Sequence, residues 1–222
     1  MITVAICCYG LFHEPARSPK ELKGLRQYLW ACAQYITHLY KEGRLSGVIL
    51  CGGHTNAAFP HLSEAKTNGI QLKEFLKELG VPPLATNILR EELSENTPQN
   101  IDETVKAMTW GLYSQRTIDV ATMEPPVSRR FMEVTNDSWR SLSHRVVFVC
   151  DSCRHLKVEA IIYQLKRQQF GWGMDFNFGV VSFRRLDTHP NSSWWKQAVG
   201  ALLYYLNDRL VIKALRHPST FA

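Results

Sequence analysis

The stretch VVFVCDSCRH (146–155) is a run of apolar residues that gives way abruptly to polar ones. Two further stretches share this pattern, GVILCGGHTN (47–56) and NILREELSENTPQN (87–100). Each predicts a strand that runs into the start of a helix. In a parallel α/β sheet the carboxyl ends of the strands face a common crevice, where ligands bind. The three junctions therefore predict one ligand site.

Strands and helices are predicted to alternate along the chain. Apolar runs predict strands near 4–8, 48–51, 88–89, 146–150 and 176–183, and helical periodicity predicts helices near 20–42, 63–79, 97–112, 151–169 and 193–215. Parallel strands need such crossover connections. The predicted fold class is therefore α/β, a three-layer α/β/α Rossmann-like domain with a mainly parallel sheet of about five strands.

Residues 1–222 are predicted to form a single domain, because this length suits one hydrophobic core. The segment 115–143 interrupts the alternation, and we expect either a lid or excursion near the site or a surface loop. In the last helix one apolar stripe is predicted to be buried; it consists of Trp195, Val199, Leu202, Leu206 and Leu210.

Composition indicates a folded protein that favours anionic partners. Apolar residues make up 45% of the chain and charged residues 21%, as in globular proteins. The net charge of +6 favours nucleotides and phosphates. No basic stripe is interleaved with aromatic residues, so nucleic-acid binding is not favoured. No stretch is long enough to span a membrane. Cysteines within apolar runs are typical of a reducing compartment, so we expect a cytoplasmic location.

The first junction contains a pair of glycines. Gly52 and Gly53 allow a close approach of the backbone to a ligand, although a plain turn explains them equally well. His54 and Asn56 would then project into the crevice. The pair is part of neither a G-x-G-x-x-G fingerprint nor a P-loop, so ordinary dinucleotide binding and P-loop hydrolysis lose support.

The second junction offers carboxylates and amides. Glu91 ends the third predicted strand, and Glu64 lies in the first turn of the preceding helix, where a carboxylate also suits the helix dipole. Thr97, which precedes a proline, is predicted to cap the next helix. Asn96 and Asn100 gain little from helix formation, so they are predicted to bind a ligand or to bridge two loops.

The third junction combines a cap with a histidine. Asp151 or Ser152 can cap the helix that follows, and His155 lies in its first turn, near free backbone amides. An acid/base role or a phosphate contact for His155 is one interpretation, and a merely packed histidine is the other. The spacing of Cys150 and Cys153 suits metal or redox chemistry, but cysteines on strands are more often small apolar residues.

In chain order these elements resemble the ElyC/SanA/YdcF domain family. The matching pieces, within residues 2–165, are CGGH (51–54), SEA (63–65), GVP (80–82), Glu91 with SENTPQN (94–100), and Ser152 with His155. The resemblance implies a Rossmann-like fold with a polar crevice, a small-molecule ligand such as S-adenosylmethionine or a similar nucleotide-like compound, and an envelope-related role for some members. Where the family has an arginine, this chain has Val158; Lys157 or Arg154 would then make the anion contact.

The leading expectation is a small anionic or nucleotide-like metabolite bound at the strand ends. Its anionic part would meet Gly52, Gly53 and residues 151–155, and its polar or cationic parts would meet Glu64, Glu91, Asn96 and Asn100. If a reaction occurs, His155 or His54 paired with Glu64 or Glu91 predicts hydrolysis or group transfer. The alternatives are a phosphoesterase or nucleotide hydrolase whose divalent metal is held by Glu64, Glu91 and Asp151, and a non-catalytic regulatory module. The oligomeric state stays open.

Overall fold

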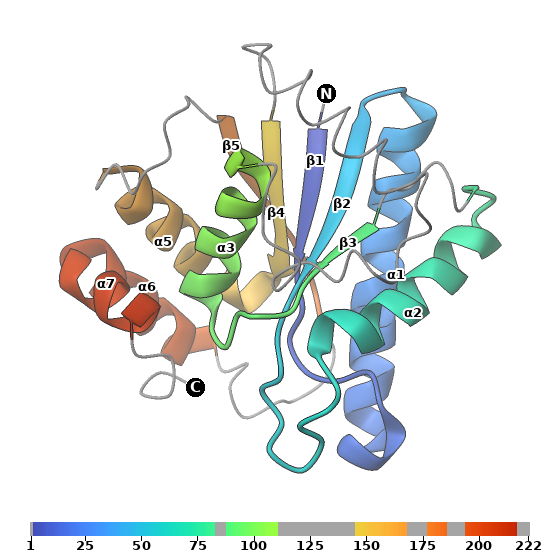
Figure 1. Cartoon of the computed structure of the whole chain (residues 1–222), viewed down its shortest axis with the longest axis horizontal. Helices are drawn as coiled ribbons and strands as arrows, with labels where there is room; N and C mark the ends of the chain where they lie inside the picture. The colour runs from blue at the N-terminus through green and yellow to red at the C-terminus, as the bar shows by residue number, and fades with distance from the viewer. Residues whose placement is uncertain (1, 83–87, 111–144, 168–176, 186–193, 217–222) are drawn as a thin grey trace.

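The computed structural model describes residues 2–82, 88–110, 145–167, 177–185 and 194–216. Within these ranges, five strands form one sheet in which all pairings are parallel (Figure 1). The strands are β1 (Ile2–Cys7), β2 (Leu45–Cys51), β3 (Ile88–Glu91), β4 (Arg145–Asp151) and β5 (Asn177–Phe183). Their order in the sheet is β3-β2-β1-β4-β5. The parallel sheet predicted from the sequence is confirmed.

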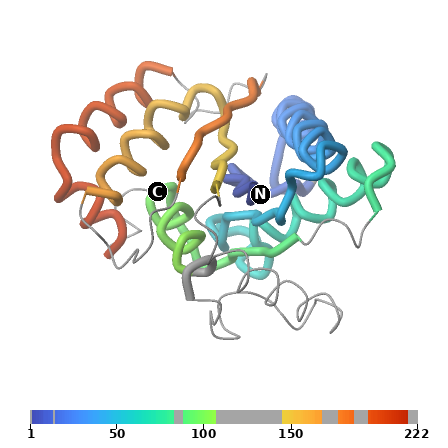
Figure 2. Tube along the Cα trace, turned by 90° about the horizontal axis from the view of Figure 1, so that it is seen from above, coloured from blue at the N-terminus to red at the C-terminus, as the bar shows by residue number. Residues whose placement is uncertain are grey.

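Helices cover both faces of this sheet (Figures 1 and 2). One face packs against α1 (Pro19–Lys41) and α2 (Glu64–Glu78), and the other packs against α3 (Thr97–Trp110) and α5 (His155–Arg167). The helices α6 (Trp194–Leu206) and α7 (Asp208–Arg216) pack against α5. Two short 3-10 helices, η1 (Glu14–Ala16) and η4 (Ser152–Arg154), precede α1 and α5. The predicted three-layer α/β/α architecture is therefore confirmed.

The central strand β1 is apolar on both faces because helices cover both. Val4 and Ile6 point into the core beneath α1 and α2, whereas Ala5 and Cys7 point into the core beneath α3 and α5. Successive side chains of a strand alternate between the faces of its sheet. A strand that is buried on both sides is thus a continuous apolar run, as the sequence shows.

Helix starts follow local capping rules, with one correction. The hydroxyl of Ser63 accepts a hydrogen bond from the Lys66 amide at 3.0 Å and caps α2. Thr97 was predicted to cap α3, and this is wrong, because Thr97 is already the first helical residue. The cap is Asn96, whose side-chain oxygen accepts from the Gln99 amide at 3.0 Å.

The C-terminal helical region also differs from its prediction. It consists of two helices, because the Asn207 side chain accepts a hydrogen bond from the Arg209 amide at 3.1 Å and starts α7. The buried residues of α6 are Gln197, Ala201 and Tyr204. The predicted apolar stripe is mostly exposed: Trp195 61%, Val199 50%, Leu202 57% and Leu206 72%. Ala201 and Tyr204 pack into the core shared with α5, and most of the predicted stripe faces away from it.

Two sequence predictions fall partly or wholly beyond the described ranges. The segment 115–143, predicted as a lid or a loop, lies outside the described residues. The prediction of a single domain over residues 1–222 also includes undescribed segments and stays a prediction. Among the described residues, no helix is both long enough and apolar enough to cross a membrane.

The direction of winding reverses between β1 and β4. From β1 the chain builds β2 and then β3 on one side, and it later returns to the other side of β1 to build β4 and β5. Tyr28 of α1 is fully buried at this point. Its hydroxyl lies 3.1 Å from the carbonyl oxygen of Cys7 and 3.1 Å from that of Val149. One side chain thus ties the carboxyl ends of the two central strands together.

We expect Tyr28→Phe to lower the free energy of unfolding by about 1–2 kcal/mol, because two buried carbonyl groups lose the single hydroxyl proton that they share. Urea denaturation followed by circular dichroism measures the change. Tyr35→Phe is the matched control, since the partly buried Tyr35 hydroxyl contacts no described hydrogen-bond partner; this change should stay within about 0.5 kcal/mol. Equal effects of the two substitutions would contradict the proposed tie.

Candidate ligand-binding site

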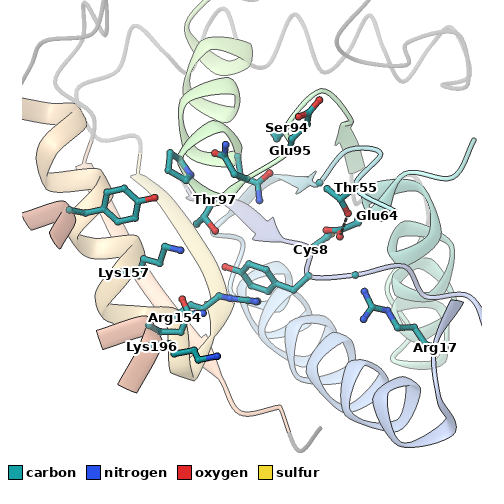
Figure 3. A pocket seen from close by; sticks show the side chains of 18 residues that line it. Cys8, Arg17, Thr55, Glu64, Ser94, Glu95, Thr97, Arg154, Lys157 and Lys196 are labelled. Carbon is teal, nitrogen blue, oxygen red and sulfur yellow. Dashed lines mark hydrogen bonds between the residues drawn. The ribbon is translucent and has the colours of Figure 1, made fainter. Parts of the chain in front are cut away.

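A cavity of about 420 Å³ opens at the carboxyl ends of the central strands (Figure 3). Its wall comes from the loops after β1, β2 and β3, from the starts of α2, α3 and α5, and from α6. The volume is typical of pockets that hold metabolites. Among the residues predicted from the sequence, those lining this cavity are Gly52, Glu64, Asn96, Thr97, Asn100, Arg154 and Lys157.

The other predicted site residues do not line the cavity; they are Gly53, His54, Asn56, Glu91, Asp151, Ser152 and His155. The Nδ1 atom of His54 lies 2.9 Å from the carbonyl oxygen of Pro60, and its ring is exposed. His155 lies 3.2 Å from Glu159, one turn further along α5. Neither histidine shares the cavity wall with Glu64, so their acid/base roles stay predictions.

The glycine pair joins two loops of the wall. Gly52 donates a backbone hydrogen bond to the Glu91 carbonyl at 3.0 Å, and Gly53 donates one to the Ser94 carbonyl at 2.8 Å. A Cβ atom added at Gly53 would lie 2.5 Å from that Ser94 oxygen. Only glycine permits this approach. Gly52 borders the cavity, and Gly53 presses the β2–α2 loop against the β3–α3 loop.

The buried side chain of Glu91 stabilises the β3–α3 loop through hydrogen bonds. Its side chain is 1% exposed and accepts hydrogen bonds from the backbone amides of Leu93 at 2.7 Å and Ser94 at 2.9 Å. The Ser94 hydroxyl donates to the second carboxylate oxygen. Burial raises the pKa of the Glu91 carboxyl to about 7, although these hydrogen bonds oppose the rise. Glu91 therefore shapes the wall rather than facing the cavity.

The two asparagines of the β3–α3 region differ in role. Besides capping α3, Asn96 donates from its side-chain nitrogen to the Ala214 carbonyl in α7 at 2.9 Å. Asn96 therefore joins the β3–α3 loop to a helix, α7, rather than to a second loop as one of the two alternatives predicted. Asn100 is 5% exposed, and its side-chain oxygen has no hydrogen-bond partner among the described residues. Asn100 therefore brings an unused acceptor to the cavity wall.

Arg154 brings an unused donor to the same wall. Its guanidinium carbon lies 3.7 Å from the centre of the Tyr9 ring, so the two side chains stack. The side chain is buried, and among the described residues its Nη1 atom has no hydrogen-bond partner. A buried guanidinium is normally paired with a carboxylate or another acceptor. Tyr9 thus fixes in place a positive charge that is able to bind an anion.

Further cations lie beside Arg154. Lys157 and Lys196 line the same side of the cavity in Figure 3. Burial, reinforced by the charge of Arg154, lowers the pKa of the Lys157 amine to about 8. Val158, at the family's arginine position, is fully buried in the core, so Arg154 and Lys157 supply the positive charge at this junction.

A buried carboxylate lies across the cavity from these cations (Figure 3). Glu64 accepts a hydrogen bond from the Thr55 hydroxyl at 2.6 Å and another from the backbone amide of Gly10. Burial raises the pKa of the Glu64 carboxyl. Gly10 has a φ of 105°, a left-handed conformation that favours glycine, and this turn brings the chain back over the site. The cavity therefore offers a cationic side and an acidic side.

Metal and thiol chemistry find little support in the geometry. Within the described ranges, no group of three or more His, Cys, Asp or Glu side chains could hold a metal ion, so Glu64, Glu91 and Asp151 do not form the metal site considered from the sequence. All six cysteines are described and free. Burial raises the pKa of Cys153 to about 11, which disfavours a reactive thiolate.

Several lining residues were not found from the sequence. Tyr9 directly follows a predicted strand, so the strand-end argument used at the other three junctions would have found it. Arg17 lies in a polar loop that carries no motif. Lys196 and Gln197 belong to α6, and only the packing of α6 onto α5 brings them to the cavity. No local pattern signals their role.

Comparisons with protein-family models, with curated proteins and with solved structures find no match for this chain.

Replacing Glu91 by glutamine should change how stability depends on pH. The pKa of the wild-type Glu91 carboxyl is about 7 in the folded protein and about 4.5 in the unfolded chain. Because the unfolded chain loses this proton first, the free energy of unfolding falls as the pH rises from about 4.5 to about 7. Glutamine cannot ionise, yet its oxygen can accept from the Leu93 and Ser94 amides while its nitrogen donates to the Ser94 hydroxyl. We expect Glu91→Gln to exceed the wild-type free energy of unfolding by about 1–3 kcal/mol at pH 8 and to match it near pH 4.

Denaturation curves recorded between these pH values test this expectation. Glu74→Gln, at an exposed position of α2, is the matched control and should follow the wild type throughout. A constant difference between Glu91→Gln and the wild type across the range would show that the carboxyl does not ionise during unfolding as described.

Proposed function

We propose that this chain binds a small anionic or nucleotide-like metabolite in the cavity at the strand ends. The observation that carries the proposal is Arg154: a buried guanidinium, stacked on Tyr9, with a nitrogen that has no partner among the described residues. A buried polar nitrogen that lacks an acceptor is costly. A carboxylate or phosphate of a ligand would supply the missing acceptor, and Lys157 would reinforce the contact.

The acidic side of the cavity favours a ligand that also carries donor groups. Glu64 can accept from an amino group or from ribose hydroxyls, and the free oxygen of Asn100 can accept from a further donor. S-adenosylmethionine combines a carboxylate, an amino group and a ribose, so it belongs with nucleotides and sugar phosphates among the first ligands to test. The volume of about 420 Å³ suits molecules of this size.

We also propose a family and a cellular location for this chain. The residues shared with the ElyC/SanA/YdcF pattern support membership of that family. The six free cysteines support a reducing compartment such as the cytoplasm. Hydrolysis or group transfer on the bound ligand would need an acid or base in the cavity wall; Glu64 lies there, whereas His54 and His155 do not.

A thermal-shift screen with S-adenosylmethionine, S-adenosylhomocysteine, nucleotides and sugar phosphates tests the proposal. A ligand at about a hundred times its Kd should raise the free energy of unfolding by about 2.7 kcal/mol. We expect Arg154→Gln to abolish most of this shift because the anion loses its buried partner. Arg184→Gln, at an exposed position away from the cavity, is the matched control and should keep the shift.

Two outcomes would overturn the proposal. One is that no anionic compound stabilises the wild type. The other is that a stabilising compound shifts the melting temperature of Arg154→Gln as much as that of the wild type. In both comparisons the ligand-induced shift is measured relative to each variant without ligand, so a change in intrinsic stability does not affect the result.

A further inference from the structure

Lys157 occupies a place in the cavity that differs from that of an ordinary surface lysine. Its aliphatic stem lies over Gly200 of α6, with its Cδ atom 3.9 Å from the position that a Cβ of Gly200 would take. Its Nζ atom lies 5.5 Å from the centre of the Tyr204 ring. Figure 3 shows the amine pointing into the cavity beside Arg154. The packing of α6 on α5 thus directs the amine toward the cavity.

No carboxylate compensates the charge of this amine. Among the described residues Lys157 forms no ion pair or hydrogen bond through its side chain. The groups around it are Cys153 and Arg154 from η4, and Lys196 and Tyr204 from α6. Burial lowers the pKa of the amine most, the positive charge of Arg154 lowers it further, and Cys153 opposes the shift. These surroundings lower the pKa of the Lys157 amine to about 8, so a fraction of the amine is unprotonated near neutral pH.

An unprotonated amine next to a fixed cation is the arrangement that makes a lysine nucleophilic toward carbonyl groups. We propose that Lys157 forms an imine with an aldehyde or ketone that carries a carboxylate or phosphate group held by Arg154. The anion contact in this inference rests on the proposed function, but the nucleophilic amine does not. The substrate class is therefore that of oxo acids and aldehyde or ketone phosphates.

Imine formation needs only the amine, the carbonyl compound and proton exchange with water. The nitrogen of Lys157 adds to the carbonyl carbon, and a proton moves from nitrogen to the former carbonyl oxygen. That oxygen then takes a second proton from solvent and leaves as water while the C=N bond forms. The protonated imine returns a proton to solvent when its nitrogen loses the remaining N–H. No electron donor or acceptor is consumed. The guanidinium of Arg154 would hold the anionic group of the substrate and so bring the carbonyl carbon within reach of the amine.

Trapping with a small anionic aldehyde tests this inference on the wild-type protein. Glyoxylate and sodium cyanoborohydride are added at about pH 7.5, where an amine of pKa about 8 is partly unprotonated, and the modified lysines are identified by peptide mass spectrometry. Reduction of the imine leaves a carboxymethyl group on the reacting lysine. We expect Lys157 to be modified roughly ten times faster than Lys196, an exposed lysine of the same cavity.

A neutral aldehyde separates this inference from the proposed function. Acetaldehyde should also label Lys157 ahead of Lys196, since it needs the amine but no anion contact. Arg154→Gln should slow labelling by glyoxylate more than labelling by acetaldehyde. Lys157→Met retains an apolar stem over Gly200 and should lose the adduct at this position while leaving labelling of Lys196 unchanged.

The outcomes are distinct. If Lys157 reacts no faster than Lys196 with either aldehyde, the proposal that Lys157 is nucleophilic is refuted. This conclusion does not depend on the results for Arg154→Gln. If Lys157 reacts fast with both aldehydes and Arg154→Gln slows both equally, the amine is upheld and the anion contact of the proposed function is refuted. Because the central comparison is made between two lysines of one wild-type protein, it does not depend on how any variant folds.

Discussion

The reversal of winding between β1 and β4, secured by the hydroxyl of Tyr28, is the constraint on which the site depends. Connections that leave these two strands run to opposite faces of the sheet, so the chain leaves a gap between their carboxyl ends. Tyr9 follows β1, Arg154 follows β4, and the two side chains stack across this gap. The cation of the site is therefore positioned by the topology of the sheet as well as by its own neighbours.

Sequence patterns located the strand ends, and through them Gly52, Glu64, Asn100 and Arg154. They did not fix the direction of each side chain. His155 and Arg154 are consecutive, yet one residue around a helical turn rotates a side chain by about 100°, so only Arg154 reaches the cavity. The face of α6 was misjudged because size was equated with burial. The buried residues are Gln197, Ala201 and Tyr204, and Ala201 and Tyr204 join the core shared with α5.

Polar groups near the cavity fall into two sets that do different things. Glu91, Asn96 and Gly53 are hydrogen-bonded within the protein and hold the loops of the wall in place. The Nη1 atom of Arg154 and the side-chain oxygen of Asn100 are buried without partners among the described residues. Each such group costs about 1–3 kcal/mol when nothing satisfies it. The first set thus stabilises the loops of the wall, and these two unsatisfied groups lie in the wall of the cavity.

The contact between α3 and α7 has a consequence for how the protein is made. The start of α3 is held by hydrogen bonds from Asn96 to the Ala214 carbonyl and from Gln99 to the Leu215 carbonyl. These acceptors are synthesised more than a hundred residues after their donors. During translation the strands β1 to β3 can emerge and pair first, but this part of the cavity wall forms only after α7 has been synthesised. A nascent chain therefore has a partly formed sheet before the wall of the cavity is complete.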